Sequence, residues 1–265
     1  AASEGCEIII LNLFKTEVFF ELHTKIKIIW PKLDRSTMHR YLYALRLIPY
    51  IRKNIKKLNP DAVLSFGEWF NSYVILATRG LNVPIFVTDR MGPDMVLGLI
   101  LATGIIAQTQ TAAQRIQSKT GAKHIKVIPN GVKVSKIPFL TKRNQIVTVG
   151  RLSREKGHTY LIQAFAQLKR EDWSLHIIGD GPERSKLEEE CKNLNISDRV
   201  KFYGFLNYFI NILAESEIFV LPSLYEGFPN ALLEAMSIPL ACISSDCIAG
   251  PSDIIENNKN GILVE

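Results

Sequence analysis

The 265-residue sequence predicts a protein of the α/β class, with two domains that each carry a parallel sheet covered by helices. Short apolar strand patterns alternate with helical patterns along the chain, as in successive βαβ units. The length suits two domains of ordinary size, and 47% hydrophobic residues are enough for both to bury a core. We place the domains at residues 1–134 and 135–265.

The N-terminal half shows six strand patterns and one long helical pattern. The predicted strands are Glu7–Leu13, Ile26–Ile29, Ala62–Phe66, Ile85–Thr88, Gly104–Gln108 and Ile125–Ile128. A helix is predicted over residues 41–58, because apolar residues recur there at helical spacing. Its predicted core face consists of Leu45, Ile48, Ile51, Ile55 and Leu58.

Positive charge is concentrated in this half of the chain. Residues 1–135 hold 18 Lys and Arg against 9 Asp and Glu, a net charge of +9, whereas residues 136–265 hold 14 against 17, a net charge of −3. Several cations flank the predicted helix: Arg46, Arg52, Lys53, Lys56 and Lys57. Two interpretations stay open, a solvated basic face on a core-facing helix or attraction to anionic lipid or a lipid diphosphate. We expect no nucleic acid partner, because aromatic residues are not interleaved with these cations.

The C-terminal half repeats the order strand, loop and helix. Strands are predicted at Gln145–Gly150, Ser174–Ile178, Arg199–Tyr203, Glu217–Leu221 and Leu240–Ser244. Arg151 and Lys156 follow the first of them, so they lie at the carboxyl edge of the sheet, where ligands bind in open α/β folds. A forked guanidinium and a compact ammonium together suit a diphosphate, although single cations on loops are more often solvated.

Residues 222–234 follow a buried strand and place two carboxylates, Glu226 and Glu234, eight positions apart. Pro229 has the fixed φ of a first helical residue, which puts Glu226 on the loop and Glu234 about one turn into the helix. Free N–H groups at the helix start can hold a phosphate, while each carboxylate accepts hydrogen bonds from hydroxyls. The arrangement suits a nucleotide sugar. The alternative is two solvated glutamates around an ordinary turn.

Two cofactor classes fit the sequence poorly. Gly179–Pro182 resembles the start of a dinucleotide fingerprint, but Arg184 occupies the place of its third glycine, which argues against a nicotinamide or flavin site. No Asp-x-Asp cluster is present to hold a metal–diphosphate complex, so we expect Arg151 and Lys156 to serve instead of a metal ion.

Taken in order, these motifs resemble the nucleotide-sugar domain of the family 4 retaining glycosyltransferases. That family has the GT-B fold, in which two Rossmann-like βαβ domains face each other across a cleft. The matching motifs are Gly150–Leu152, Glu155–Gly157, Gly179–Pro182, Phe219–Ser223, Glu226–Pro229, Glu234–Met236, Gly250–Pro251 and Asn260–Gly261. Residues 128–132 resemble the segment that enters this domain, whereas the N-terminal half matches only through its βα rhythm.

The resemblance implies a role for each motif. Arg151 and Lys156 would hold the donor diphosphate, Glu234 the ribose hydroxyls and Glu226 the transferred sugar, so that Glu226, Arg151 and Lys156 form the predicted catalytic group. The base would meet the backbone around Leu206. The remaining donor contacts would come from Gly179, Gly181, Gly227, Phe228, Pro229 and Asn230. Retention is usually explained in this family by attack on the face from which the phosphate departs, so Glu226 need not be a nucleophile.

Weaker candidates for an acceptor contact follow two strands of the N-terminal half. Glu68, Trp69 and Asn71 come after the strand that ends at Phe66, and Arg90 follows the next strand. The alternative for Trp69 is packing on its own domain.

We therefore expect a retaining glycosyltransferase without metal or other cofactor. It would move a hexosyl or N-acetylhexosaminyl group from a nucleoside diphosphate sugar, with UDP favoured, to a glycan or lipid-linked acceptor of surface polysaccharide synthesis. The alternatives are a GT-B sugar-nucleotide epimerase and a non-catalytic nucleotide-binding scaffold.

The resemblance also bears on the extent and location of the chain. The sequence lacks the family's first strand, glycine-rich loop and last helices, so we expect these residues to belong to a longer chain. Four cysteines lack metal-binding spacing, and the longest uncharged apolar run, residues 95–107, is too short for a bilayer. We expect a cytoplasmic protein, at the inner face of the plasma membrane if the lipid interpretation holds.

Overall fold

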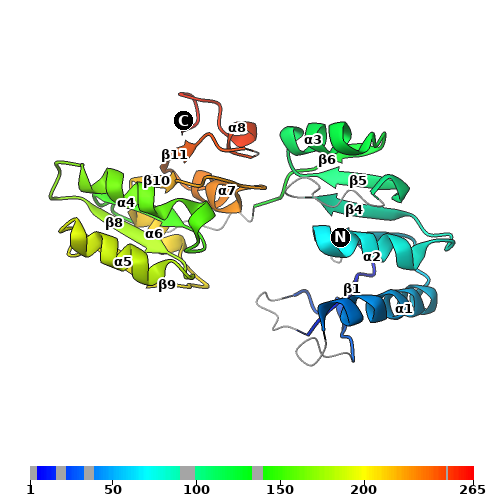
Figure 1. The fold of residues 1–265 in the computed structure, drawn as a ribbon. Coiled ribbons are helices and arrows are strands. Elements are labelled where there is room, and N and C mark those ends of the chain that lie inside the picture. Colours follow the sequence, from blue (N-terminus) through cyan, green and yellow to red (C-terminus); the bar gives the residue numbers. More distant parts are fainter. Residues whose placement is uncertain (1–4, 16–21, 33–38, 90–98, 133–139, 249) are drawn as a thin grey trace. The chain divides into compact units, whose positions relative to one another are not determined.

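The computed structural model describes residues 5–15, 22–32, 39–89, 99–132, 140–248 and 250–265 (Figure 1). The chain forms two compact units, one mainly from the N-terminal half and one from the C-terminal half together with residues 107–116. The predicted domain boundary between residues 134 and 135 lies outside the described residues and stays a prediction.

The described N-terminal half contains two sheets. β1 (Ile9–Leu11) pairs in parallel with β2 (Lys27–Ile29), and a four-stranded sheet has the order β3 (Val63–Phe66), β4 (Ile85–Asp89), β5 (Gly104–Ala107), β6 (Ile125–Val127). The helical elements are α1 (Arg40–Leu58), α2 (Glu68–Thr78), η2 (Leu99–Leu101) and α3 (Gln110–Thr120). All six predicted strands are confirmed. The observed ends of each strand lie within two residues of the predicted ends.

The long helix is confirmed, but its predicted core face is partly wrong. Among the described side chains of α1, Tyr43, Leu47, Ile51 and Ile55 are buried, each four residues from the next. Leu45 is 64% exposed, because 100° per residue places it across the helix from Leu47 and Ile51. The spacing of Ile51 and Ile55 identified the buried stripe correctly, and extending it to Leu45 did not.

The C-terminal unit is built on a six-stranded parallel sheet. Its order is β12 (Ile262–Val264), β11 (Ala241–Ser245), β10 (Ile218–Leu221), β7 (Gln145–Val149), β8 (Ser174–Ile178), β9 (Val200–Gly204). The helices are η3 (Arg154–Lys156), α4 (His158–Ala166), α5 (Arg184–Asn193), α6 (Ile210–Glu215), α7 (Asn230–Met236) and α8 (Pro251–Ile254). The predicted strands of this half are confirmed.

Side chains that alternate along the strands build two cores, one on each face of this sheet. Leu175 and Ile177 of β8 pack with Leu161 and Leu187 of α4 and α5. Val147 and Phe219, on β7 and β10, belong to the second core, which also receives Leu213 and Leu232 of α6 and α7. Both faces are therefore occupied by packed apolar side chains, which leaves the edge of the sheet for ligands.

Candidate active site

The carboxyl edge of the six-stranded sheet has a topological switch point between β7 and β10. From β7 the chain continues to β8 on one side, whereas β10 lies on the other side and leads outward to β11. The loops that leave β7 and β10 therefore diverge at this point. Ligands of open α/β sheets bind in such a crevice.

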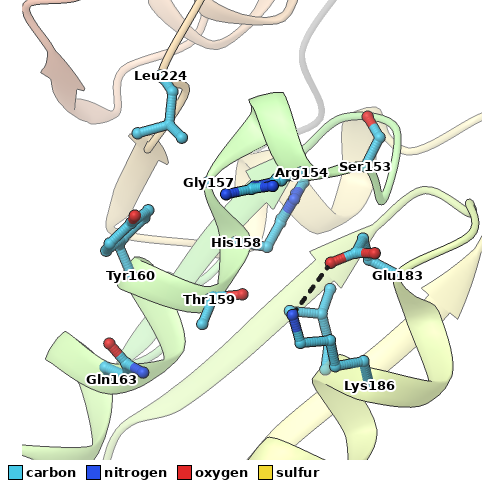
Figure 2. A pocket seen from close by; sticks show the side chains of 11 residues that line it. Ser153, Arg154, Gly157, His158, Thr159, Tyr160, Gln163, Glu183, Lys186 and Leu224 are labelled. Carbon is cyan, nitrogen blue, oxygen red and sulfur yellow. Dashed lines mark ion pairs between the residues drawn. The ribbon is translucent and has the colours of Figure 1, made fainter.

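A hollow of about 500 Å³ lies beside the N-terminal end of α4 (Figure 2). It is lined by Ser153, Arg154, Gly157, His158, Thr159, Tyr160, Gln163, Glu183, Lys186, Leu187 and Leu224. None of the predicted donor or catalytic residues is among them. The hollow shares with the candidate site the loop that carries Lys156 and, through Leu224, the loop that carries Glu226.

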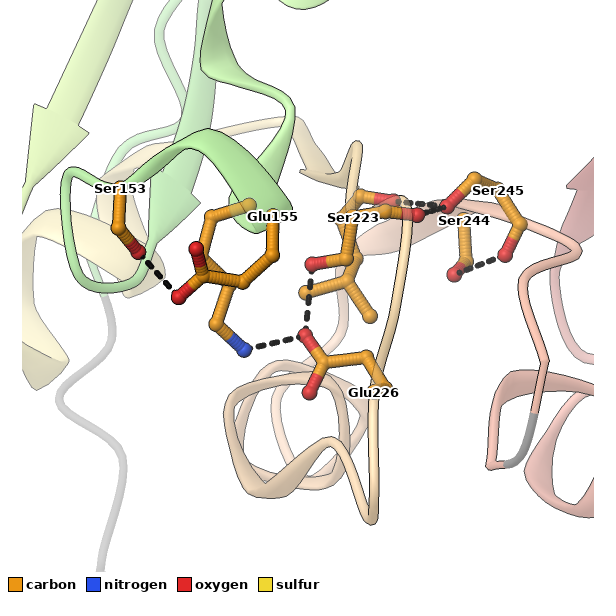
Figure 3. A network of polar contacts seen from close by, with 8 residues as sticks. Ser153, Glu155, Ser223, Glu226, Ser244 and Ser245 are labelled. Carbon is orange, nitrogen blue, oxygen red and sulfur yellow. Dashed lines mark hydrogen bonds and ion pairs between the residues drawn. The ribbon is translucent and has the colours of Figure 1, made fainter. Parts of the chain in front are cut away.

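A buried ion pair joins the two diverging loops (Figure 3). Nζ of Lys156, at the end of η3, lies 2.6 Å from Oε1 of Glu226, on the loop after β10. Oγ of Ser223 donates a hydrogen bond to the same oxygen, also at 2.6 Å. Glu226 is only 5% exposed, and the Lys156 side chain is 25% exposed. The structure thus brings two predicted catalytic residues together and adds Ser223, which the sequence had placed only in a strand motif.

Backbone contacts hold the two loops at this separation. The N–H of Leu224 donates to the carbonyl of Glu155 at 2.8 Å. Gly157 has φ +64°, and a Cβ there would lie 2.0 Å from the carbonyl oxygen of Pro222. Only glycine allows this approach, so the residue after Lys156 helps to fix the distance between Lys156 and Glu226.

Gly179 and Gly181 support the loop that carries Arg151. A Cβ on Gly179 would lie 1.8 Å from the carbonyl oxygen of Gly150, and a Cβ on Gly181 would lie 2.3 Å from that of Leu152. Leu152 also donates its N–H to the carbonyl of Asp180 at 3.0 Å. Close backbone packing therefore explains both glycines, and their predicted donor contacts stay predictions.

Arg151 is exposed at the start of this loop. Within the described part of the chain, its guanidinium forms no hydrogen bond or ion pair, although the neighbouring Lys156 is paired. Because the backbone on both sides of Arg151 is hydrogen-bonded, its side chain is the part of this loop that is free to meet an anion.

Glu234 lies on α7 with its side chain half-buried. Burial raises the pKa of this carboxyl, and none of the residues described here donates a hydrogen bond to it. The N–H groups of Gly227 and Phe228, just before α7, also lack partners among the described residues. Among the described residues, this edge therefore has a carboxylate that can accept hydrogen bonds from a ligand and backbone N–H groups that can donate them.

The start of α7 differs from the prediction. The helix begins at Asn230, and Pro229 occupies the N-cap position with φ −81° and ψ 83°, so it is not the first helical residue. This ψ value lies outside the helical range. The proline ring fixes φ but does not fix ψ. Glu234 nevertheless lies about one turn into the helix, as expected.

The other predicted residues are placed as follows. The Leu206 side chain packs against the core around Phe219, which leaves only its backbone for a base. Phe228 is partly buried and Asn230 is exposed. Glu68 and Trp69 open α2 directly after Gly67, so they belong to a helix.

Asn71 is 1% exposed, and its side chain forms hydrogen bonds within its own half of the chain. Its Nδ2 donates to the carbonyl of Thr88 at 2.8 Å, and its Oδ1 accepts from Oγ of Ser65 at 2.7 Å. The geometry therefore favours a structural role over the predicted acceptor contact. Arg90 lies outside the described residues.

Three further residues near the ion pair were missed. Oγ of Ser245, on β11, donates to the carbonyl oxygen of Ser223. Burial, followed by the charge of Glu226, raises the pKa of the Cys247 thiol. His158 is buried next to Lys156, and burial together with the Lys156 charge lowers its pKa to about 4. The positions of Ser245 and Cys247 depend on which strands are neighbours, which no local sequence pattern reveals, whereas His158 lies two residues after Lys156 in the sequence.

Comparison with known proteins places the chain in a family. Residues 133–265 match the family described as glycosyl transferases group 1, and residues 2–136 match the family described as glycosyltransferase family 4. The chain is a family 4 glycosyltransferase.

Relatives of this glycosyltransferase include proteins of surface glycan synthesis. A lipopolysaccharide 1,6-galactosyltransferase of Escherichia coli K12 is 38% identical over 85% of this chain and 67% of its own length. An α-1,4-N-acetyl-D-galactosaminyltransferase of Campylobacter jejuni, which acts on an undecaprenol-linked glycan by its name, is 24% identical over 97% of this chain and 76% of its own length. The chain spans 33 to 78% of the length of curated relatives that it matches.

Solved structures agree on the architecture. The apo form of the lipopolysaccharide outer core galactosyltransferase WaaB is 27% identical, with a TM-score of 0.70 over 91% of this chain and 71% of its own. Anabaena HepE in complex with UDP is 19% identical, with a TM-score of 0.71 over 90% of this chain and 72% of its own. The glycosyltransferase therefore has the predicted GT-B fold.

Proposed function

We propose that this glycosyltransferase moves a hexosyl or N-acetylhexosaminyl group from a UDP-sugar, with retention, to a glycan or lipid-linked acceptor in surface polysaccharide synthesis. The observation that carries the proposal is the Lys156–Glu226 pair at the switch point, with Arg151 and Glu234 at the same edge and without partners in the described chain. The relatives named for galactosyl and N-acetylgalactosaminyl transfer support the sugar class, and the UDP complex of HepE supports the nucleotide.

The chemistry follows from the charges at this edge. The hydroxyl of the acceptor attacks the anomeric carbon on the face that the diphosphate leaves, the bond from that carbon to the phosphate oxygen breaks, and the hydroxyl proton passes to that oxygen. Negative charge that develops on the leaving diphosphate is met by Arg151 and by the remaining protons of the Lys156 ammonium. Glu234 accepts hydrogen bonds from the ribose hydroxyls, and Glu226 accepts one from the transferred sugar.

Because two cations meet the leaving charge in this proposal, transfer should not need a divalent ion. The test measures transfer from UDP-, GDP- and ADP-sugars by the full-length protein in excess EDTA. We expect undiminished transfer from a UDP-sugar. Loss of transfer in EDTA that Mg²⁺ or Mn²⁺ restores would contradict the metal-free mechanism.

The same assay, run with and without acceptor, distinguishes a transferase from the two alternative functions. An epimerase would convert the donor sugar without any acceptor, whereas a scaffold would bind UDP and turn nothing over. For a transferase we expect release of UDP that depends on added acceptor.

We also propose that α1 contacts an anionic membrane at the cytoplasmic face. The helix contains no Asp or Glu, and Leu42 and Leu45 are 57% and 64% exposed; at 100° per residue they share a face of the helix with exposed Lys53 and Lys56. Apolar side chains insert into the boundary of the headgroups while cations meet anionic lipid. None of the described helices has the length and apolarity needed to cross a bilayer.

Vesicle sedimentation tests this contact. The full-length protein should sediment with vesicles that contain phosphatidylglycerol and less with pure phosphatidylcholine, and the double variant Leu42→Ser/Leu45→Ser should lose most binding. Leu101→Ser removes a similarly exposed leucine outside α1 and is the control. Equal binding by the double variant and the control would contradict the proposal.

A further inference from the structure

The two carboxylate oxygens of Glu226 have different surroundings. Oε1 accepts hydrogen bonds from Nζ of Lys156 and Oγ of Ser223, each at 2.6 Å. Oε2 has no hydrogen-bond partner within the described residues. A buried carboxylate loses its water, so hydrogen bonds that it accepts decide both its charge and its orientation. One oxygen of Glu226 is therefore committed to the protein, and the other is available.

Ser223 is buried, and its position beside Glu226 is fixed by its neighbours. The residue is 0% exposed and lies directly after β10 and Pro222. Its carbonyl oxygen accepts a hydrogen bond from Oγ of Ser245, at the end of the neighbouring strand β11 (Figure 3). Ser223 is thus held from β11 while its hydroxyl is directed at Glu226.

The two donors on Oε1 come from different loops, and together they fix the plane of the carboxylate. Lys156 approaches from the loop after β7, and Ser223 approaches from within the loop after β10. With only Lys156, whose stem has several rotatable bonds, the carboxylate could turn about its own side-chain torsions. The short Ser223 side chain removes this freedom.

We propose that Ser223 is a positioning residue that fixes Glu226 through Oε1 and so presents Oε2 to one hydroxyl of the transferred sugar. This inference rests on the proposed function and deepens it. Lys156 then serves two partners, because one of its protons stays on Glu226 while the others face the diphosphate. Ser223 acts on recognition of the sugar and not on recognition of the nucleotide.

The test uses Ser223→Ala in the full-length protein, with Ser216→Ala as the matched control. Ser216 is also 0% exposed in the same unit, and its Oγ donates to the carbonyl of Ile212 at 2.7 Å. For Ser223→Ala we expect kcat/KM for the UDP-sugar to fall about 10- to 100-fold, as for loss of a hydrogen bond to a charged group. UDP affinity by calorimetry should stay within about twofold. Ser216→Ala should leave kcat/KM nearly unchanged.

A comparison of kinetic constants separates positioning from a general structural effect. Because Glu226 is assigned to the transferred sugar and not to the nucleotide, Ser223→Ala should change kcat and KM for the UDP-sugar and leave inhibition by UDP nearly unchanged. Ser223→Thr keeps a hydroxyl and should restore kcat/KM, including where Ser223→Ala folds poorly. Equal losses in the Ala and Thr variants, or a parallel loss of UDP inhibition, would overturn the inference.

Failure of the proposed function gives a different result. If the wild-type protein transfers no sugar from any donor, the proposed transfer is wrong. The inference is then decided by binding alone, since Ser223→Ala should weaken UDP-sugar and not UDP. Parallel loss of both affinities would overturn it.

Discussion

The carboxyl edges of the two larger sheets make an instructive contrast. At the edge of β3 and β4, Asn71 is neutral and buried, and its amide oxygen and nitrogen form hydrogen bonds with Ser65 and Thr88. At the edge of β7 and β10, Lys156 and Glu226 form a buried pair of opposite charges. Both networks tie neighbouring strands together, and at the second edge Arg151 and Glu234 lie without partners among the described residues.

The difference shows which polar network is structural and which is prepared for a ligand. A buried charge pair costs desolvation that an apolar pair of the same shape would avoid, so it is weak support for stability. Arg151 and the carboxylate of Glu234 lie at the same edge without partners in the described chain. Unpaired groups around a costly ion pair indicate binding, whereas the satisfied amide of Asn71 indicates packing.

The largest effect should follow from breaking the buried pair on one side. Lys156→Met removes the ammonium and leaves Glu226 buried without its charge partner, which we expect to cost about 2–4 kcal/mol in the free energy of unfolding. The double variant Lys156→Met/Glu226→Gln should recover most of this loss, because no charge is left unpaired. Denaturant midpoints of the C-terminal unit measure both.

A surface pair provides the control for this experiment. Lys186 lies 3.6 Å from Glu183, and its side chain is 71% exposed. Lys186→Met should change the free energy of unfolding by less than about 0.5 kcal/mol. Equal costs for Lys156→Met and Lys186→Met would remove the contrast between the two kinds of pair.

The neutral network of the N-terminal half should show the opposite profile. Asn71→Ala leaves Oγ of Ser65 and the carbonyl of Thr88 without their partner, which should cost about 1–3 kcal/mol of stability. UDP affinity should not change, because the nucleotide is assigned to the other sheet. A matching fall of UDP affinity in calorimetry would show that the two edges do not divide the work in this way.

The smallest change concerns the unpaired carboxylate. Burial raises the pKa of Glu234, so its folded state binds a proton more readily than the unfolded chain, and its charge costs stability at neutral pH. Glu234→Gln should therefore raise the midpoint of unfolding slightly at pH 7 while weakening UDP and UDP-sugar alike.

A pH titration adds a second test of this role. In the wild type, UDP affinity should fall as the pH drops through the raised pKa of Glu234, at a higher pH than an ordinary glutamate would give. Glu234→Gln should lose this step. Glu226→Gln should spare free UDP and depress turnover, so equal loss of UDP binding in the two variants would contradict the separate roles.

The sequence predicted the strands and the motif positions well, because each depends on local patterns. Ser174–Ile178 is a strand in prediction and in structure, since its apolar run is bounded by turn residues. The contact between Lys156 and Glu226 was beyond such patterns, because the two residues are 70 positions apart and meet only where β10 lies beside β7. The role of Asn71 was missed for the same reason, since Asn71 lies on α2 and its partner Thr88 lies on β4.

The central claim is that UDP binds through the cations at the edge of β7 and β10. Isothermal calorimetry of UDP with the wild type, Arg151→Ala and Lys156→Ala tests it most directly, with Asn71→Ala as the control. We predict that UDP affinity falls about 10- to 100-fold in both cation variants, as for loss of hydrogen bonds to a charged group, and stays unchanged in the control. Unchanged UDP affinity in both Arg151→Ala and Lys156→Ala would contradict the account.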